Sequence, residues 1–280
     1  MSFDIKQKIT RLRLAGNWQG LVAERWPKLF FAPDQLLENP TVIFKSDKGN
    51  STVLKEIGSG NSKSYVVVKK NINRTGVRAF VDFVRYPKSV RNFRLAAILK
   101  LKGLEVAEPV AALWNRQKGS IYITEYIQNS LNLYDIVFGK NKEILANFSI
   151  RKTVIKRTAE IVAKLHKSNY WHRDSKAGNF IVYKDNSGEY KIKLIDLDGI
   201  KKSIVVREKN CLRTLSRLAE TLTRFNTVNF TDLYRGFLCY CSVMGISSVQ
   251  ARKLFYKAEK LTVATRLLTI IADSYKIKDK

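Results

Sequence analysis

The 280-residue chain is poor in the side chains that form disulfide frameworks and structural zinc sites. Its three cysteines are Cys211, Cys239 and Cys241, and this odd number argues against a disulfide framework and for a reducing compartment. Cys239 and Cys241 lie two residues apart in a predicted helix, where their side chains do not face each other. With two histidines and no CxxC pair, a structural zinc site is not expected either.

Long apolar segments are also missing. The first sixteen residues carry charges throughout and contain no apolar core, so a secretory signal is not expected. The longest charge-free candidate for a membrane span, residues 236–251, has sixteen residues, fewer than the ~20 that a span needs. We therefore expect a protein that is soluble or bound peripherally to a membrane.

Acidic residues are few. The chain has 24 Asp and Glu against 51 Lys and Arg, which gives a formal net charge of +27 and a pI of about 10.0. A surface of this sign attracts nucleic acid, acidic lipid or phosphorylated glycan, and charge alone does not choose among them. The hydrophobic content of 45% and the charged content of 27% are ordinary for a globular protein and argue against wholesale disorder.

The first region of the chain has the pattern of a small antiparallel sheet with one helix. β-branched runs alternate with turn segments there, after an aromatic-bearing extension to about residue 40. The expected strands cover residues 41–46, 51–57, 64–70, 104–113 and 120–126, and the expected helix covers residues 89–101.

The second region is mainly helical in pattern. We therefore predict an α+β fold of two lobes, an N-lobe at residues 1–126 and a helical C-lobe at residues 127–280, with a ligand-binding cleft between them. In the C-lobe an amphipathic helix precedes a hairpin-like pair of strands. The helical patterns cover residues 131–137, 150–167 and 211–274, and the strand patterns cover residues 179–183 and 191–197.

The most informative segment is residues 172–179, HRDSKAGN, which matches the H-R-D-x-x-x-x-N catalytic loop of protein kinases. Residues 194–199, LIDLDG, place Asp196 where the acid of D-F-G would stand. Phosphoryl transfer needs a carboxylate that holds and deprotonates the acceptor hydroxyl, and Asp174 is the candidate. Asn179 and Asp196 are the candidate oxygen ligands of the magnesium ion that neutralises the triphosphate.

Three neighbouring residues have secondary roles in this interpretation. Lys176, two residues after the candidate base, is placed to stabilise charge on the transferred group. His172 is interpreted as a structural member of the loop, because the base is already present. Asp198 is either a second metal ligand or a solvated turn residue, and the sequence leaves this open.

An ATP site also needs a lysine on the sheet of the N-lobe. Lys69 is the candidate and Lys70 is the alternative, because adjacent strand residues point to opposite faces. The first hairpin turn, which contains Gly49, is expected to cover the phosphates. Backbone groups of Glu125 and Ile127, where the lobes join, are expected to bind adenine.

Together these residues resemble the lipopolysaccharide kinase family, the Kdo and core-heptose kinases of Gram-negative bacteria, over about residues 41–245. The resemblance includes the lysine, the catalytic loop, the I-D-L-D strand end and the segments 212–218 and 232–238. It implies a bilobal protein-kinase-like fold, ATP and Mg²⁺ as cofactors, and a Kdo or heptose hydroxyl of the lipopolysaccharide inner core as acceptor. It also implies a cytoplasmic location at the inner face of the cytoplasmic membrane.

Two features depart from protein kinases. Kinases pair the lysine with a helix glutamate, and the matching position here is Asn92. The short distance from Asp196 to the helix near Cys211 leaves little room for a peptide-docking activation segment, and no A-P-E-like segment appears there. A glycan or another small acceptor is therefore favoured over a protein.

The basic surface is expected to contact an anionic membrane peripherally, and no obligate protein partner is evident. Ten basic residues and one acid lie in residues 69–102, and Lys88, Arg91 and Arg94 lie in or beside the predicted N-lobe helix. One alternative is a small-molecule kinase of the choline or aminoglycoside type. The other is a non-catalytic module on a kinase scaffold that binds membrane or nucleic acid, although no RNP, zinc-finger or homeodomain signature supports nucleic acid. The sequence does not distinguish Kdo from heptose.

Overall fold

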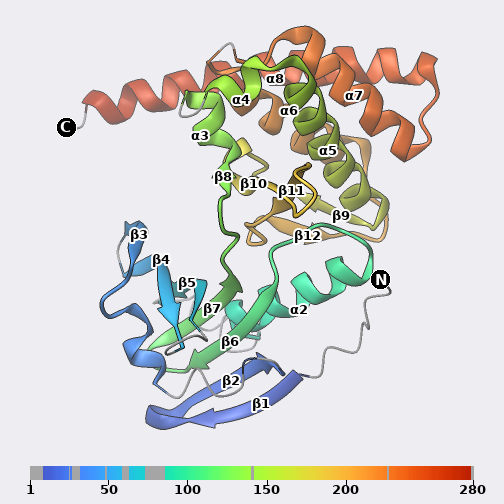
Figure 1. Ribbon diagram of the computed structural model, residues 1–280. Helices are drawn as coiled ribbons and strands as arrows, with labels where there is room; N and C mark the ends of the chain where they lie inside the picture. Colours follow the sequence, from blue (N-terminus) through green and yellow to red (C-terminus); the bar gives the residue numbers. More distant parts are fainter. Residues whose placement is uncertain are drawn as a thin grey trace. The chain divides into compact units, whose positions relative to one another are not determined.

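A computed structural model describes residues 9–24, 26, 32–47, 49–58, 63–72, 86–139, 142–225 and 227–278 (Figure 1). The chain divides into two compact units, one made of residues 1–101 and 106–127 and the other of residues 102–105 and 128–280. The first unit is rich in strands and the second is mainly helical, which confirms the α+β fold class.

The first unit contains a seven-stranded antiparallel sheet in the order β1-β2-β6-β7-β5-β4-β3. The strands expected in this region are all present, and one helix follows β5, as predicted. The elements are β1 (Ile9–Leu14), β2 (Trp18–Ala23), β3 (Val42–Asp47), β4 (Asn50–Ile57), β5 (Ser64–Asn71), α2 (Lys88–Leu101), β6 (Pro109–Asn115) and β7 (Gly119–Glu125).

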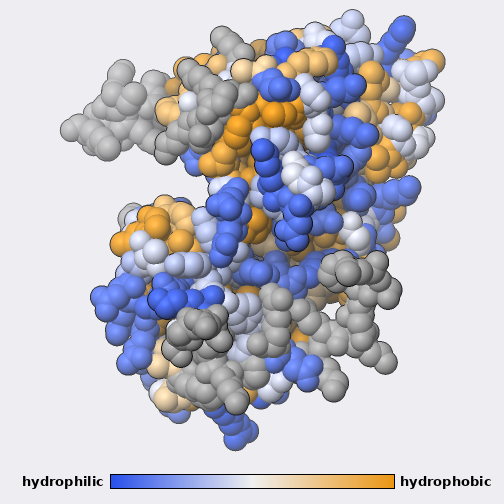
Figure 2. Space-filling model, viewed as in Figure 1, coloured by the Kyte–Doolittle hydropathy of each residue, from blue (hydrophilic) through white to orange (hydrophobic). Residues whose placement is uncertain are grey.

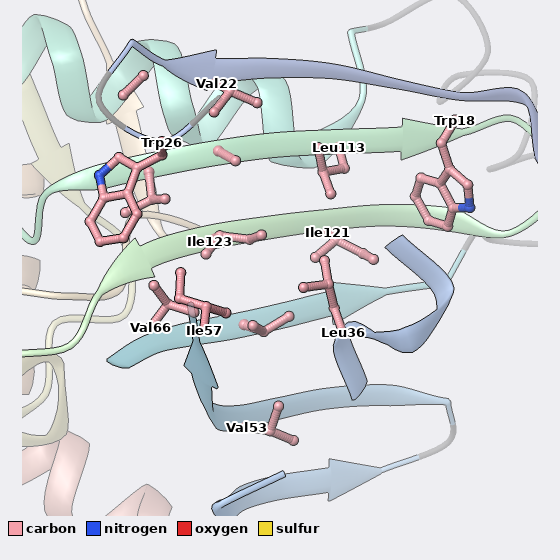
Figure 3. Close-up of a cluster of buried hydrophobic side chains, with 14 residues drawn as sticks. Trp18, Val22, Trp26, Leu36, Val53, Ile57, Val66, Leu113, Ile121 and Ile123 are labelled. Atoms are coloured by element: carbon pink, nitrogen blue, oxygen red, sulfur yellow. The ribbon is translucent and has the colours of Figure 1, made fainter. Parts of the chain in front are cut away.

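The two faces of this sheet are covered differently. On one face, a cluster of buried side chains runs from Trp18 to Trp26 and includes Ile121 and Ile123, with the short helix η2 (Pro33–Leu37) beside it (Figure 3). On the other face lies α2, whose residue Phe93 packs with Tyr122 of β7. Burial of these side chains supplies the main stabilisation of the sheet.

The first unit differs from the sequence-based expectation in two places. The expected extension to about residue 40 contributes two strands, because Trp18 of β2 is buried in the sheet's main cluster. The strand expected from residue 104 begins at Pro109 instead. Glu105, four residues before β6, belongs to the second unit, where its carbonyl accepts a hydrogen bond of 2.9 Å from the Leu194 amide.

The second unit combines small sheets with a group of helices. A helix was expected from residue 131, but residues 131–132 form a short strand and the helix begins at Leu133, because the Asn132 side chain caps it by accepting the Tyr134 amide at 2.9 Å. The elements are β8 (Leu131–Asn132), α3 (Leu133–Phe138), α4 (Lys142–Ala146), α5 (Phe148–Lys167), β9 (Tyr170–His172), η4 (Ala177–Asn179), β10 (Phe180–Lys184), β11 (Tyr190–Leu194), β12 (Ile200–Lys202), α6 (Glu208–Thr223), α7 (Phe230–Met244) and α8 (Ser248–Lys278).

The helices α5 and α7 pack closely against each other. The buried carboxylate of Asp232 on α7 is paired with Arg151 of α5 at 2.9 Å. Gly236 of α7 lies so near Ile155 that an added Cβ would come within 2.7 Å of its side chain. In the part of the chain that the structure describes, no helix has the length and apolar character needed to cross a membrane.

Candidate active site

The catalytic loop in the second unit is organised around the buried imidazole of His172. The Asp174 amide lies 3.2 Å from Nδ1 and must donate to it, so Nε2 carries the ring proton and donates to the Asp196 carbonyl at 3.0 Å. Burial lowers the pKa of His172, and the Asp196 carbonyl only partly opposes this. The neutral imidazole therefore joins the catalytic loop to the end of the next strand.

Gly199 allows this arrangement because it lies directly against the imidazole. A Cβ at this position would come within 2.4 Å of Cε1 of His172. Strand β12, which begins at Ile200, pairs with β9 through Ile200 and His172. The glycine of the LIDLDG segment is therefore required, because any side chain at this position would collide with the His172 ring.

Asp174 projects from the loop between two cations. Its Oδ2 pairs with Nζ of Lys176 at 2.9 Å, and its Oδ1 accepts from Nη1 of Arg217 at 3.0 Å. Partial burial raises the pKa of the Asp174 carboxyl, but the hydrogen bond and charge of Lys176 and the charge of Arg217 outweigh it, so the pKa lies below its ordinary value. Asp174 is therefore a carboxylate at neutral pH.

Asn179 and Asp196, the two predicted metal ligands, meet at the same imidazole. Nδ2 of Asn179 donates to the Asp174 carbonyl at 2.9 Å and lies 3.3 Å from Nε2 of His172. Its Oδ1 receives no hydrogen bond from the described residues. Oδ1 of Asp196 accepts the Asp198 amide at 3.2 Å.

This donor set suits a hard divalent cation. It offers one carboxylate and one amide oxygen, and Mg²⁺ commonly binds to one or two protein oxygens together with water and substrate phosphates. In the described ranges, no group of three or more His, Cys, Asp or Glu side chains could hold a metal ion. The residues present therefore fit a Mg²⁺ ion whose other ligands come from a nucleotide.

Helix α6 supports the loop at both ends and was missed as part of the site by sequence reasoning. Oγ1 of Thr214 donates to the His172 carbonyl at 3.0 Å, and Oγ1 of Thr221 accepts the Ala177 amide at 2.8 Å. These threonines and Arg217 lie at spacings of three and four residues, so they share one helical face. A search of the sequence for polar residues at this helical spacing could have identified the three residues.

In the first unit, the strand register separates Lys69 from Lys70. Lys69 pairs with Tyr122, which packs against α2, whereas Lys70 pairs with Ile121 in the cluster on the opposite face. Asn71, on the same face as Lys69, accepts a hydrogen bond of 2.8 Å from Nζ of Lys88 at the start of α2. Lys69 is therefore the lysine on the helix-covered face.

The other residues predicted to bind nucleotide are spread along the same sheet. Gly49 lies in the turn between β3 and β4 with φ of +79°, a conformation that favours glycine. Its neighbour Lys48 lies outside the described residues. Glu125 ends β7, and Ile127 is the last residue of the first unit. Asn92, at the position of the kinase glutamate, belongs to the buried stripe of α2.

Comparisons with known proteins identify the family and the fold. The sequence model described as "Lipopolysaccharide kinase (Kdo/WaaP) family" matches residues 52–236, more than half of the chain. A solved structure, "WaaP in complex with acyl carrier protein", aligns with a TM-score of 0.55 at 15% identity over 85% of this chain and 95% of that one. The family interpretation and the kinase-like fold are thereby confirmed.

A curated relative matches a shorter segment. "Probable serine/threonine-protein kinase fnkE" of Dictyostelium discoideum is 33% identical over 87 residues, which is 31% of this chain. The aligned segment spans 6% of the length of that relative.

The two cations beside Asp174 can be tested by titration. Arg217→Met removes one cation, and we expect the pKa of the Asp174 carboxyl to rise toward its ordinary value, because only Lys176 still favours the charged form. NMR of the carboxyl carbon measures this pKa. The matched control is Arg213→Met, since Arg213 is exposed and lies one turn earlier on α6. An unchanged pKa in Arg217→Met, or the same rise in both variants, would contradict the assignment.

Proposed function

Because the chain belongs to the lipopolysaccharide kinase (Kdo/WaaP) family, we propose that it transfers a phosphoryl group from ATP to a Kdo or heptose hydroxyl of the lipopolysaccharide inner core. One observation carries the proposal. The Asp174 carboxylate is held between Lys176 and Arg217, in a loop whose imidazole binds the Asp196 carbonyl and whose Asn179 amide binds the Asp174 carbonyl. A general base beside two oxygen ligands is what phosphoryl transfer to an alcohol requires.

Each side chain of the loop has a task in this proposal. Asp174 accepts a hydrogen bond from the acceptor hydroxyl and takes its proton as the new P–O bond forms, while the bond from the γ-phosphorus to the β–γ bridging oxygen breaks and ADP leaves. The two cations that bind the Asp174 carboxylate, Lys176 and Arg217, can stabilise negative charge on the transferred phosphoryl group. His172 stays neutral and holds the loop against the end of β11 through its hydrogen bond to the Asp196 carbonyl.

Asn179 and Asp196 would hold Mg²⁺ through Oδ1 and the carboxylate. When bound, the ion would neutralise the charge of the triphosphate. The amide of Asn179 is oriented for this, because its nitrogen is engaged by the Asp174 carbonyl. Lys69 would contact the phosphates, Gly49 would allow a close approach of the hairpin turn, and the backbone at Glu125 and Ile127 would bind adenine.

Two features favour a glycolipid acceptor. Between Asp196 and α6 the chain has only residues 197–207, which include β12, so a long peptide-docking segment is absent from this described stretch. The net charge of +27 suits an acceptor that carries phosphates and carboxylates at an anionic membrane. The proposal thus includes peripheral contact with the inner face of the cytoplasmic membrane, where Arg91 and Arg94 are exposed on α2.

The acceptor class is decided by a screen of ATP consumption. Purified core glycolipid should stimulate ATP turnover, and choline or aminoglycosides should not. Stimulation by the small alcohols alone would replace the proposal with a small-molecule kinase. An absence of turnover with every acceptor would favour a non-catalytic basic module on a kinase scaffold.

Asp174→Asn should leave the fold and Mg-ATP binding intact, because the shape and the metal ligands remain. We expect kcat to fall by ~10²–10⁴, the usual contribution of general-base catalysis. Steady-state turnover and calorimetric titration with Mg-ATP measure the two properties. Near-normal turnover in Asp174→Asn would show that Asp174 is not the general base.

Asp196→Ala should weaken the binding of ATP in the presence of Mg²⁺, because a negative oxygen donor is lost from a hard cation. ATP binding without metal should not change. Asn179→Ala should have the same effect more mildly, since an amide oxygen is neutral. Asp185→Ala, which alters a carboxylate in the exposed turn between β10 and β11, is the control. The metal-ligand assignment is wrong if Asp196→Ala and this control bind Mg-ATP equally well.

Lys69→Met should weaken ATP binding by about tenfold to a hundredfold, the contribution of a hydrogen bond to a charged group. Lys70→Met should change it by less than about twofold, because Lys70 lies on the opposite face of β5. Calorimetry of both variants with Mg-ATP is the measurement. A larger loss in Lys70→Met would reverse the assignment of the two faces.

A further inference from the structure

The connection between β12 and α6 carries two apolar side chains in open solvent. Ile204 is 94% exposed and Val205 is 70% exposed, and no other large hydrophobic side chain in the described ranges is as exposed as Ile204. We call these two residues the apolar tip. Transfer of these two side chains from water into an apolar environment would be favourable, and the charges beside them indicate which environment that is.

The apolar tip is held firmly at both ends. Before it, the Ser203 amide donates to the Asn169 carbonyl at 2.9 Å, where β12 pairs with β9. After it, the Arg207 carbonyl accepts the Asn210 amide at 2.8 Å in the first turn of α6. The backbone on each side of the tip is therefore fixed without help from the two apolar side chains.

Exposed basic residues flank the apolar tip on both sides in the sequence. The acid in this segment, Glu208, is paired with Lys257 of α8 at 2.6 Å, so its charge is balanced. The surroundings are thus positive. The residues that make up this basic rim are Lys201, Lys202, Arg207 and Lys209.

We propose that the apolar tip inserts into an anionic phospholipid bilayer while the basic rim binds the lipid headgroups. Two apolar side chains are far too small for a stable protein interface, which buries ~1,200–2,000 Å² in total. A bilayer needs no complementary shape, and an apolar insertion combined with basic charges is the pairing that interfacial binding uses. The charge of the rim selects anionic lipid.

Insertion would also place the site. The tip follows β12, and Ile200 of β12 pairs with His172 at the start of the catalytic loop. A bilayer that binds the tip would therefore lie near the catalytic loop. This consequence rests on the proposed function, in which the acceptor sugar belongs to a membrane glycolipid. Binding of the tip to lipid does not depend on that function.

Figure 2 shows that apolar residues also gather elsewhere on the surface, for example over β3. Val42, Ile43 and Phe44 of that strand are 44–62% exposed. On α8, Leu267 and Leu268 are 56% and 68% exposed. The pair on α8 belongs to the same unit as the tip, so it provides a matched control.

The test is co-sedimentation of the full chain with vesicles of phosphatidylcholine and phosphatidylglycerol, compared with vesicles of phosphatidylcholine alone. The unaltered chain should bind the anionic vesicles and not the neutral ones. Ile204→Ser combined with Val205→Ser should lower the partition constant by at least about tenfold, the effect of losing burial of an Ile or Val side chain. The control Leu267→Ser with Leu268→Ser should change it by less than about twofold.

The basic rim is tested in the same assay. Lys201→Gln with Lys202→Gln should lower binding by about fivefold for each charge and should make binding less sensitive to salt. Thermal unfolding of each variant checks that the fold is kept. Turnover on a water-soluble core fragment should not change in the tip variant, whereas failure of the proposed function would appear as absent turnover in every variant, with vesicle binding unaffected.

Four results would overturn the proposal. The tip variant could bind anionic vesicles as well as the unaltered chain does, or the α8 control could lose as much binding as the tip variant. Equal binding of the unaltered chain to neutral and anionic vesicles would also contradict the role of the rim. Loss of affinity for an acidic carrier protein with vesicle binding intact would assign the tip to a protein partner instead.

Discussion

The catalytic loop depends on one buried, neutral imidazole. His172 receives the Asp174 amide on one nitrogen and donates to the Asp196 carbonyl with the other, so a single ring sets the distance between base and metal ligand. Protonation would put a second N–H against the Asp174 amide and break one of these bonds. Burial of the ring favours the neutral form, and Gly199 permits that burial because any Cβ there would collide with the imidazole. The H-R-D and I-D-L-D-G segments are therefore parts of one packing unit.

Helix α6 holds the catalytic loop through hydrogen bonds from its own side chains. Thr214 and Thr221 bind backbone groups before and after the loop, and Arg217 between them reaches the Asp174 carboxylate. Buried hydroxyls that bond directly to backbone are costly to remove, because the partner group would be left unsatisfied. The loop is thus ordered by a helix that follows it after a short connection.

Motifs that are local in sequence could be predicted, and contacts between distant segments could not. The H-R-D-x-x-x-x-N spacing identified Asp174 and Asn179 as candidates because a short loop brings them together. Arg217 lies 43 residues from Asp174, and no pattern near either residue reports their contact. Strand β1 was missed for a related reason, since its side chains are largely exposed and its pairing with β2 is the only feature that defines it as a strand. Lys69 and Lys70 were separated by register, which only the paired strands supply.

The electrostatics of Asp174 indicate which part of its proposed role matters most. A carboxylate between Lys176 and Arg217 has a lowered pKa, so it is always ionised at neutral pH but is a weaker proton acceptor than an isolated Asp. A stronger carboxylate base would need apolar surroundings, which raise the pKa of the carboxyl. Phosphoryl transfer passes through a loose transition state in which little proton transfer is needed early. In the proposed mechanism Asp174 therefore both orients the acceptor hydroxyl and accepts its proton, and the two cations that lower its pKa are also placed to stabilise the negative charge of the transferred group.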